Sequence, residues 1–141
     1  MTGVPPSPDV LADLAAIDEL LARYARAVDT RDWALFREVF TEDGVADYSA
    51  LDGPRGPVAE VVPWLEAALA GFSASQHLIT NREVAVDGDA ATGRCSLFNP
   101  MVLAGGPVML VGGAYTDRFA RTAAGWRFTE RVAHLVWSTT L

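Results

Sequence analysis

The chain has 141 residues and a formal net charge of −7, and half of its residues are hydrophobic. This length suits one domain with a single buried core. All 11 basic residues are arginine, so the chain has no lysine for Schiff-base chemistry or for a Walker-type phosphate loop. The one cysteine, Cys95, excludes an intramolecular disulfide and a cysteine-cluster zinc site.

The charge distribution and the start of the chain argue against further classes. The arginines are scattered among carboxylates, so we expect no nucleic-acid partner. Residues 1–8 lack the cationic and long apolar regions of a signal peptide. Residues 95–116 are uncharged over roughly the length of a membrane span. Six glycines and prolines interrupt them, which favours two buried strands joined by a turn. We therefore expect no membrane partner and a cytoplasmic location.

The first half of the chain predicts three helices. Residues 1–8 are rich in proline and predict a disordered tail, and residues 9–141 form the domain. A helix is predicted from about residue 9 to 28, because apolar residues recur at spacings of three and four: Leu14, Ile17, Leu21, Tyr24 and Val28. The polar run 29–32 resembles a cap for a second helix, Trp33 to Phe40. A turn at 41–44, a short strand at 45–49 and a loop at 51–57 precede a third helix at 58–70.

The second half predicts four long strands. The runs are Gln76–Val86, Ala90–Leu103, Val108–Ala120 and Gly125–Ser138, and short turn signals separate them. Short turns favour antiparallel neighbours. Several runs are long for strands, as a sheet that curls around a cavity requires. The order of elements predicts an α+β domain with helices on one face of a curved sheet.

Five phrases of the chain form a further pattern. They are LLARYARAVDTRDWALF at residues 20–36, FTEDGVADY at 40–48, HLITN at 77–81, VAVDGDAAT at 84–92 and GWRFTER at 125–131. These phrases resemble the SnoaL-like group of the superfamily named after nuclear transport factor 2 (NTF2). The resemblance covers about residues 10–138. It implies a cone-shaped NTF2-like fold, in which three N-terminal helices pack on a strongly curved, mixed and mainly antiparallel sheet that encloses a pocket.

Within that superfamily the pattern is most similar to the scytalone dehydratase and bile-acid 7α-dehydratase type. That type has a Tyr and an Asp at the end of the first helix and a His on the first long strand, which match Tyr24, Asp29 and His77. The resemblance implies a His–Asp pair that removes a proton beside a carbonyl, with the Tyr polarising a substrate oxygen. Scytalone dehydratase also uses a second His on the next strand, which reads RCSLFN here and has none. The strands offer no convincing equivalent of the Asp-Arg-Asp set of limonene-epoxide hydrolases.

Each of these residues also has a structural interpretation. Tyr24, on the apolar helix face, suits a core tyrosine bonded to a backbone carbonyl. Asp29 suits the N-cap of the second helix, unless Thr30 or Asp32 supplies that cap and leaves Asp29 free to point inward. A lone strand histidine such as His77 is more often structural than catalytic. A neighbouring carboxylate would change this, because it fixes the tautomer and stabilises the charged form.

Other side chains are predicted to line the pocket. They are Tyr48, Trp64, Asn81, Phe98, Asn99, Met101 and Tyr115, a set that suits a flat or polycyclic organic ligand. His134 is a candidate second acid or base and substrate contact, with a rim or interface position as the alternative. The chain has no spaced cluster of metal ligands, and its glycine pairs do not open a helix. We therefore expect neither a metal nor a cofactor.

These features predict a cofactor-independent lyase or isomerase, such as a dehydratase, an isomerase or a polyketide cyclase. Its substrate would be a small hydrophobic carbonyl compound such as a polyketide, steroid or terpenoid. His77 would take the proton, Asp29 would orient His77, and Tyr24 would bond the carbonyl or the departing hydroxyl. The alternatives are a non-catalytic binding or accessory subunit and, third, hydrolysis with Asp29 as base. The resemblance also implies a homodimer that pairs through outer sheet faces.

Overall fold

The computed structural model describes residues 3–141, so Met1 and Thr2 of the predicted tail lie outside the described residues. The helices are α1 (Pro8–Asp29), α2 (Trp33–Glu38), the 3-10 helix η1 (Ser49–Leu51) and α3 (Val58–Leu69). The strands are β1 (Phe40–Asp47), β2 (Arg55–Pro57), β3 (Phe72–Ser75), β4 (Leu78–Asp87), β5 (Ala90–Leu103), β6 (Val108–Thr122) and β7 (Gly125–Thr140).

Helix α1 buries the apolar face that its sequence predicts. Ser7 caps the helix, because its Oγ accepts a hydrogen bond from the backbone N–H of Val10 at 3.3 Å. Ile17 and Tyr24 are at most 1% exposed, so this face forms part of the core. The helix ends at Asp29, one residue beyond the predicted end, and this places the Asp29 carboxylate at the helix terminus.

The cap of helix α2 decides between two interpretations of the polar run 29–32. Asp32 is the N-cap, and its Oδ1 accepts from the backbone N–H of Leu35 at 3.0 Å. Asp29 is therefore free of the capping role. Helix α2 ends at Glu38, because Phe40 already pairs with Phe128 of strand β7, so the predicted helix is two residues too long.

The strands form one seven-stranded sheet in the order β2-β1-β7-β6-β5-β3, with β4 also paired to β5. The strands β4 to β7 are antiparallel neighbours, as predicted, and β1 is parallel to β7. The predicted turn at residues 41–44 instead lies within β1, where the register shifts between Phe40 and Val45. The short strand β2 lies in the predicted loop, and β3 lies in residues to which no element was assigned, since three or four residues carry too little periodicity to detect.

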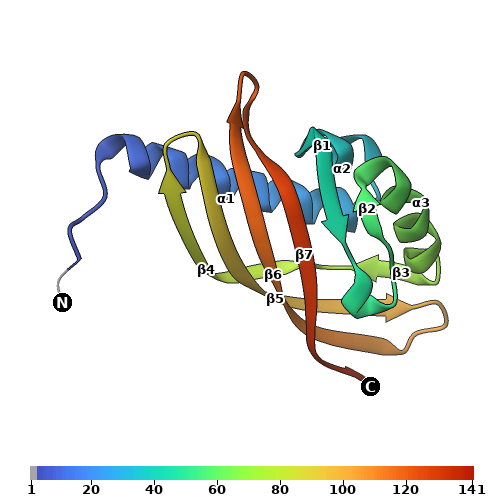
Figure 1. The fold of residues 1–141 in the computed structure, drawn as a ribbon. Coiled ribbons are helices and arrows are strands. Elements are labelled where there is room, and N and C mark those ends of the chain that lie inside the picture. Colours follow the sequence, from blue (N-terminus) through green and yellow to red (C-terminus); the bar gives the residue numbers. More distant parts are fainter. Residues whose placement is uncertain (1–2) are drawn as a thin grey trace.

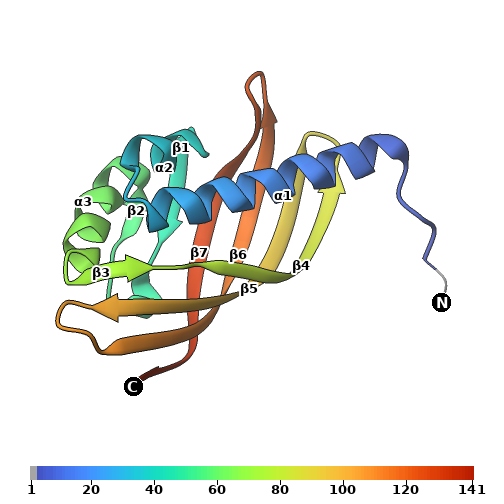
Figure 2. The ribbon, with the colours of Figure 1, turned by 180° about the vertical axis from the view of Figure 1, so that it is seen from behind.

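The sheet is strongly curved, and its two faces differ. Helix α1 runs across the concave face of strands β4 to β7, and α2 and α3 lie beside β1 and β2 at one end (Figures 1 and 2). No helix covers the convex face over residues 3–141 in these views. Register shifts at Gly112/Gly113 and Arg118/Phe119 interrupt the β6–β7 pairing, and such bulges bend strands. The predicted α+β, cone-shaped NTF2-like architecture is confirmed, with its core between the helices and the concave face.

None of the helices described within residues 3–141 is long and apolar enough to cross a membrane. The uncharged run 95–116 is instead the hairpin of β5 and β6, joined by a turn that contains Gly105 and Gly106. Both glycines have a positive φ, 98° and 110°, a conformation that a residue with a Cβ rarely adopts.

Candidate active site

A cavity of about 350 Å³ lies between the helices and the concave face of the sheet. Its wall is mostly apolar and aromatic, with contributions from α1, α3, η1 and strands β5 to β7. Polar residues in the wall are Tyr24, Tyr48, Asp52, His77, Asn99, Tyr115 and Ser138. An apolar cavity with a few polar groups is typical of a small-molecule site.

Asp29 and His77 form a hydrogen-bonded pair at the edge of this cavity. The Nδ1 of His77 lies 2.5 Å from Oδ1 of Asp29, and the backbone N–H of His77 donates to Oδ2 at 2.8 Å. The carboxylate therefore accepts from both the ring and the main chain of one residue. A carboxylate on Nδ1 places the proton of the neutral ring there and leaves Nε2 as the basic atom.

The pair is held by residues on either side of it. His77 lies in the two-residue connection between β3 and β4 rather than in the predicted strand, and Gln76 keeps that connection in the sheet by donating to the carbonyl of Pro100 at 3.0 Å. Ser75 donates its hydroxyl to Oδ1 of Asp29 at 3.0 Å, and Arg31 donates to that hydroxyl at 2.9 Å. These contacts fix the carboxylate in one orientation.

The position of Asp29 opposes its ionisation in one respect. The C-terminus of a helix carries partial negative charge, which disfavours a carboxylate. Burial also raises the pKa of Asp29, but the hydrogen bonds from the His77 ring, the His77 backbone and Ser75 outweigh it, so this pKa is lowered from its usual value. Asp29 is therefore ionised at neutral pH and can stabilise a protonated His77.

The other ring nitrogen of His77 faces Asn99. The Nδ2 of Asn99 lies 3.2 Å from Nε2 of His77, and both residues line the cavity. The His77 side chain is only 7% exposed. The basic atom therefore lies at the cavity wall, where Asn99 is its neighbour and bulk water has little access.

Two tyrosine hydroxyls meet in the cavity wall. The hydroxyls of Tyr24 and Tyr48 are hydrogen-bonded to each other, and each side chain is at most 5% exposed. Burial raises the pKa of Tyr24 and that of Tyr48 well above the usual value, so both stay protonated at neutral pH. The pair can thus donate a hydrogen bond to an oxygen of a ligand.

A model of the SnoaL-like domain family matches residues 9–132 of the chain. The chain belongs to the SnoaL-like family. An uncharacterized protein of Mycobacterium tuberculosis, Rv2910c, is 40% identical over 124 residues, which are 86% of this chain and 84% of that protein.

Solved structures share the fold of the SnoaL-like chain. A Novosphingobium aromaticivorans protein provisionally named an aromatic ring hydroxylase is 29% identical with a TM-score of 0.84, over 99% of this chain and 96% of that chain. The hexachlorocyclohexane dehydrochlorinase LinA-type3 of Novosphingobium barchaimii is 20% identical with a TM-score of 0.83, over 94% of this chain and 92% of that chain. The predicted membership of the SnoaL-like, NTF2-like superfamily is confirmed.

The SnoaL-like fold brings most of the predicted lining residues together. Tyr24, His77, Tyr48, Trp64, Asn99, Met101 and Tyr115 all line the cavity. The ring centroids of Tyr48 and Trp64 lie 5.6 Å apart, so the N-cap of η1 and helix α3 close this side of the cavity together. Asp29 contacts the cavity only through His77.

Three predicted lining residues lie elsewhere, and this corrects the predicted set. Phe98 is on the outer face of β5, next to Trp137. His134 is exposed on the outer face of β7, where its Nε2 lies 3.0 Å from the hydroxyl of Thr116. Asn81 has a positive φ of 51° at the register shift of β4, and it lines an outer groove instead.

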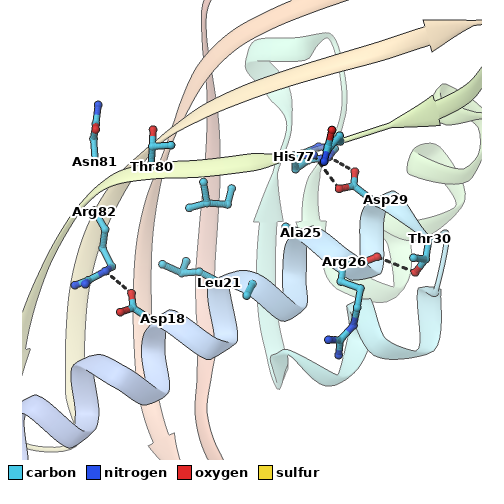
Figure 3. Close-up of a pocket in the computed structure, with 13 residues that line it drawn as sticks. Asp18, Leu21, Ala25, Arg26, Asp29, Thr30, His77, Thr80, Asn81 and Arg82 are labelled. Atoms are coloured by element: carbon cyan, nitrogen blue, oxygen red, sulfur yellow. Dashed lines mark hydrogen bonds and ion pairs between the residues drawn. The ribbon is translucent and has the colours of Figure 1, made fainter.

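This outer groove, of about 810 Å³, runs between α1 and β4 (Figure 3). The Asp29–His77 pair lies at one end of it and the Arg82–Asp18 ion pair at the other. His77 lines both spaces. Nδ1 of His77 bonds Asp29, which lines the groove, whereas Nε2 lies against Asn99, which lines the cavity.

A buried ion pair beneath the tyrosines was missed by the sequence analysis. Arg131 of β7 is 1% exposed and donates from Nε to Asp117 of β6 at 2.9 Å. Its guanidinium lies 4.1 Å from the ring centroid of Tyr24 and 3.7 Å from that of Tyr115. Burial raises the pKa of Asp117 to about 6, and Arg131 opposes this rise. The alternation of Arg131 with Ala133 and Leu135, an apolar face, was the available signal.

Among residues 3–141, no group of three His, Cys, Asp or Glu side chains gathers in an arrangement that would hold a metal ion. The side chains that the site offers are the His77 imidazole with its partner Asp29, the Asp52 carboxylate, and several hydroxyl and amide groups.

Proposed function

We propose that this SnoaL-like protein is a lyase or isomerase that removes a proton beside a carbonyl group of a small hydrophobic compound. The observation that carries the proposal is the Asp29–His77 pair, whose Nε2 lies beside Asn99 in the wall of an apolar cavity. A neutral imidazole is a base suited to neutral pH, and a fixed carboxylate stabilises the imidazolium that forms.

The proposed reaction begins at the α-carbon of the substrate. Nε2 of His77 takes the proton, and the electron pair of the broken C–H bond forms the enolate. Asp29 stabilises the charged ring without itself taking the proton. If a β-hydroxyl is present, the C–O bond breaks, a C=C bond forms, and the proton on His77 returns to the departing oxygen to give water. Without a leaving group, the same enolate is reprotonated elsewhere or closes a ring.

The Tyr24–Tyr48 hydroxyl pair is proposed to bind the carbonyl oxygen. The pair lies in the same cavity as His77, and both hydroxyls remain protonated at neutral pH. A donor placed where negative charge develops stabilises the enolate more than the ketone. Arg131, stacked on the ring of Tyr24, adds a buried positive charge behind this donor.

The cavity supports a small substrate with a flat ring system. A volume of about 350 Å³ with walls such as Trp64, Leu65 and Met101 favours a flat apolar molecule, in line with the polyketide, steroid or terpenoid classes. LinA-type3, named a dehydrochlorinase, has a scaffold of this shape. At 20% identity that likeness concerns the fold alone, and the proposal rests on the pair and the cavity.

The test uses 4-hydroxy-4-phenylbutan-2-one, a β-hydroxy ketone whose dehydration gives a conjugated enone that absorbs in the near ultraviolet. We expect the protein to form the enone, or to exchange the α-hydrogens of the ketone in D₂O, as followed by NMR. His77→Ala should reduce the rate by about 10²–10⁴-fold, the usual contribution of a general base. His134→Ala is the matched control, because that second histidine is exposed and lies outside the cavity.

Near-full turnover by a folded His77→Ala protein would contradict the proposal. A wild-type protein that binds the ketone without exchanging its α-hydrogens would favour the alternative of a non-catalytic binding subunit.

A further inference from the structure

The side-chain amide of Asn99 is hydrogen-bonded to Nε2 of His77, the ring nitrogen that is proposed to act as the base. It projects from strand β5 into the cavity wall and is 5% exposed. Its Nδ2 lies 3.2 Å from Nε2 of His77. It therefore sits against the one atom that the proposed function requires to be free for a substrate.

The direction of this hydrogen bond follows from Asp29. Because the Asp29 carboxylate can only accept, the ring proton of a neutral His77 is on Nδ1, and Nε2 is an acceptor. Asn99 must then donate from Nδ2, which turns its Oδ1 away from the ring. The Oδ1 atom is buried and has no hydrogen-bond partner among residues 3–141.

This arrangement satisfies Asn99 poorly. The 3.2 Å bond to His77 is at the long end of the range for N–H donors. A buried acceptor without a partner carries the full cost of its desolvation. With His77 neutral, the Asn99 amide thus has one weak hydrogen bond and one buried oxygen without a partner. It nevertheless lies beside the hydrogen-bonded Asp29–His77 pair.

Protonation of His77 turns Nε2 from an acceptor into a donor, so Asn99 must then accept instead of donate. The imidazolium donates from both nitrogens, so Nδ2 and Nε2–H would then be two donors facing each other. A half-turn of the amide about its last side-chain torsion replaces Nδ2 by Oδ1. The Nε2–H can then donate to Oδ1, and the buried oxygen gains its partner.

We propose that Asn99 is a positioning residue whose amide turns over between the two proton states of His77, donating to the neutral ring and accepting from the imidazolium. This proposal rests on the proposed function for its role in turnover. Proton transfer from a substrate carbon to Nε2 would leave the ring held between the Asp29 carboxylate and the Asn99 carbonyl. An interaction that strengthens as the proton moves is stronger in the transition state than in the ground state, and such an interaction accelerates the chemical step.

The first test reads the ring directly and needs no substrate. The protonation of His77 is followed by NMR of its ring nitrogens across a pH series in the wild type and in Asn99→Leu, Asn99→Asp and the control Ser96→Ala. Ser96 is on the same strand but on its outer face, opposite Thr80. We expect Asn99→Leu, which removes the acceptor, to take up its His77 proton at a lower pH than the wild type. Asn99→Asp, with a carboxylate there, should take it up at a higher pH, and Ser96→Ala should match the wild type.

The second test separates binding from turnover. With 4-hydroxy-4-phenylbutan-2-one as substrate, Asn99→Leu should lower kcat by about tenfold or more, the effect of losing one hydrogen bond to a charged group. KM should stay within about twofold, because the bond forms only after proton transfer.

Equal His77 titration in the wild type, Asn99→Leu and Asn99→Asp would overturn the proposal, as would shifts of the same sign in both variants. Asn99→Asp is close to asparagine in shape, so it preserves the test if Asn99→Leu fails to fold. Since the titration involves no substrate, its result is independent of the His77→Ala assay, and the two proposals can fail separately.

Discussion

The carboxylate of Asp29 accepts two hydrogen bonds from His77, one from the ring at 2.5 Å and one from the backbone N–H at 2.8 Å. The two residues are 48 positions apart, one at the end of α1 and one between β3 and β4. The backbone bond fixes where the histidine sits, and the ring bond fixes which nitrogen is free. One side chain therefore sets both the position and the tautomer of the proposed base.

Asp29→Asn should reduce turnover with little effect on substrate binding. The asparagine amide can donate to Nδ1, which would move the ring proton to Nε2 and remove the base. We expect kcat on 4-hydroxy-4-phenylbutan-2-one to fall by about a hundredfold or more. KM should change little, because Asp29 does not line the cavity.

The matched control is Asp18→Asn. Asp18 is on the same helix and lines the same outer groove, but it pairs with Arg82 at the other end. Equal losses in both variants would point to a general effect of charge on α1 and would contradict a specific role of Asp29.

The ionisation of Asp29 should also make the stability of the folded protein depend on pH. Its pKa in the folded protein lies below its usual value because His77 and Ser75 donate to it, an effect that exceeds the opposing effect of burial. The ionised carboxylate therefore stabilises the folded state above the unfolded pKa of about 3.9. This contribution is lost as the pH falls through the lowered folded pKa.

The measurement is urea unfolding of the wild type and Asp29→Asn at neutral pH and at acid pH. At neutral pH the free energy of unfolding of the wild type should exceed that of Asp29→Asn by about 2 kcal/mol, as expected for hydrogen bonds to a charged group. The difference should shrink below about pH 4. A difference that stays constant down to acid pH would show that ionisation of Asp29 contributes nothing.

The sequence predicted the parts of the site that lie on regular periodicity. The three- and four-residue spacing in α1 placed Tyr24 on the buried face. The resemblance paired Asp29 with His77, which the structure brings together. Spacing alone favoured Asp29 as a helix cap, and only the contact between Asp32 and Leu35 decided otherwise.

The features that the sequence analysis missed depend on interruptions of regular strand pairing or on contacts with another strand. Strict alternation would place Leu135 and Trp137 on the same face of β7. The structure opposes Leu135 to Gly113 and Trp137 to Gly112, so Val136 is an extra residue and Trp137 turns outward. A bulge of this kind depends on the neighbouring strand, which one strand's pattern does not contain. Arg131 was missed for a related reason, since its acceptor is on another strand.

The homodimer remains a proposal, and the outer sheet face offers a site for it. Leu78, Phe98 and Trp137 are 41%, 38% and 43% exposed and form a row across the convex face. Gly112 lies in this row, and a Cβ there would come within 2.0 Å of the Trp137 indole. Contiguous apolar surface of this kind is typical of a protein interface.

We expect the wild type to have the mass of a dimer in sedimentation experiments and Trp137→Glu to shift it toward the monomer. Thr92→Glu is the control, because it adds the same charge to an exposed position at the other end of the outer face. A monomeric wild type, or a Trp137→Glu protein with an unchanged dimer mass, would contradict this arrangement.

Because the Arg131–Asp117 pair is buried, removing one partner should destabilise the protein more than replacing both partners. Arg131 and Asp117 are 1% and 5% exposed, and Arg131 stacks on Tyr115 as well. Asp117→Leu would leave a buried guanidinium without a counterion, which costs about 3–5 kcal/mol of stability. Replacing both partners, in Asp117→Leu/Arg131→Met, removes the stranded charge and should recover part of that loss. Urea unfolding of the wild type, the single variant and the double variant at pH 7 measures this. A double variant less stable than Asp117→Leu would mean that the contacts of Arg131 with the aromatic rings outweigh the cost of its unpaired charge.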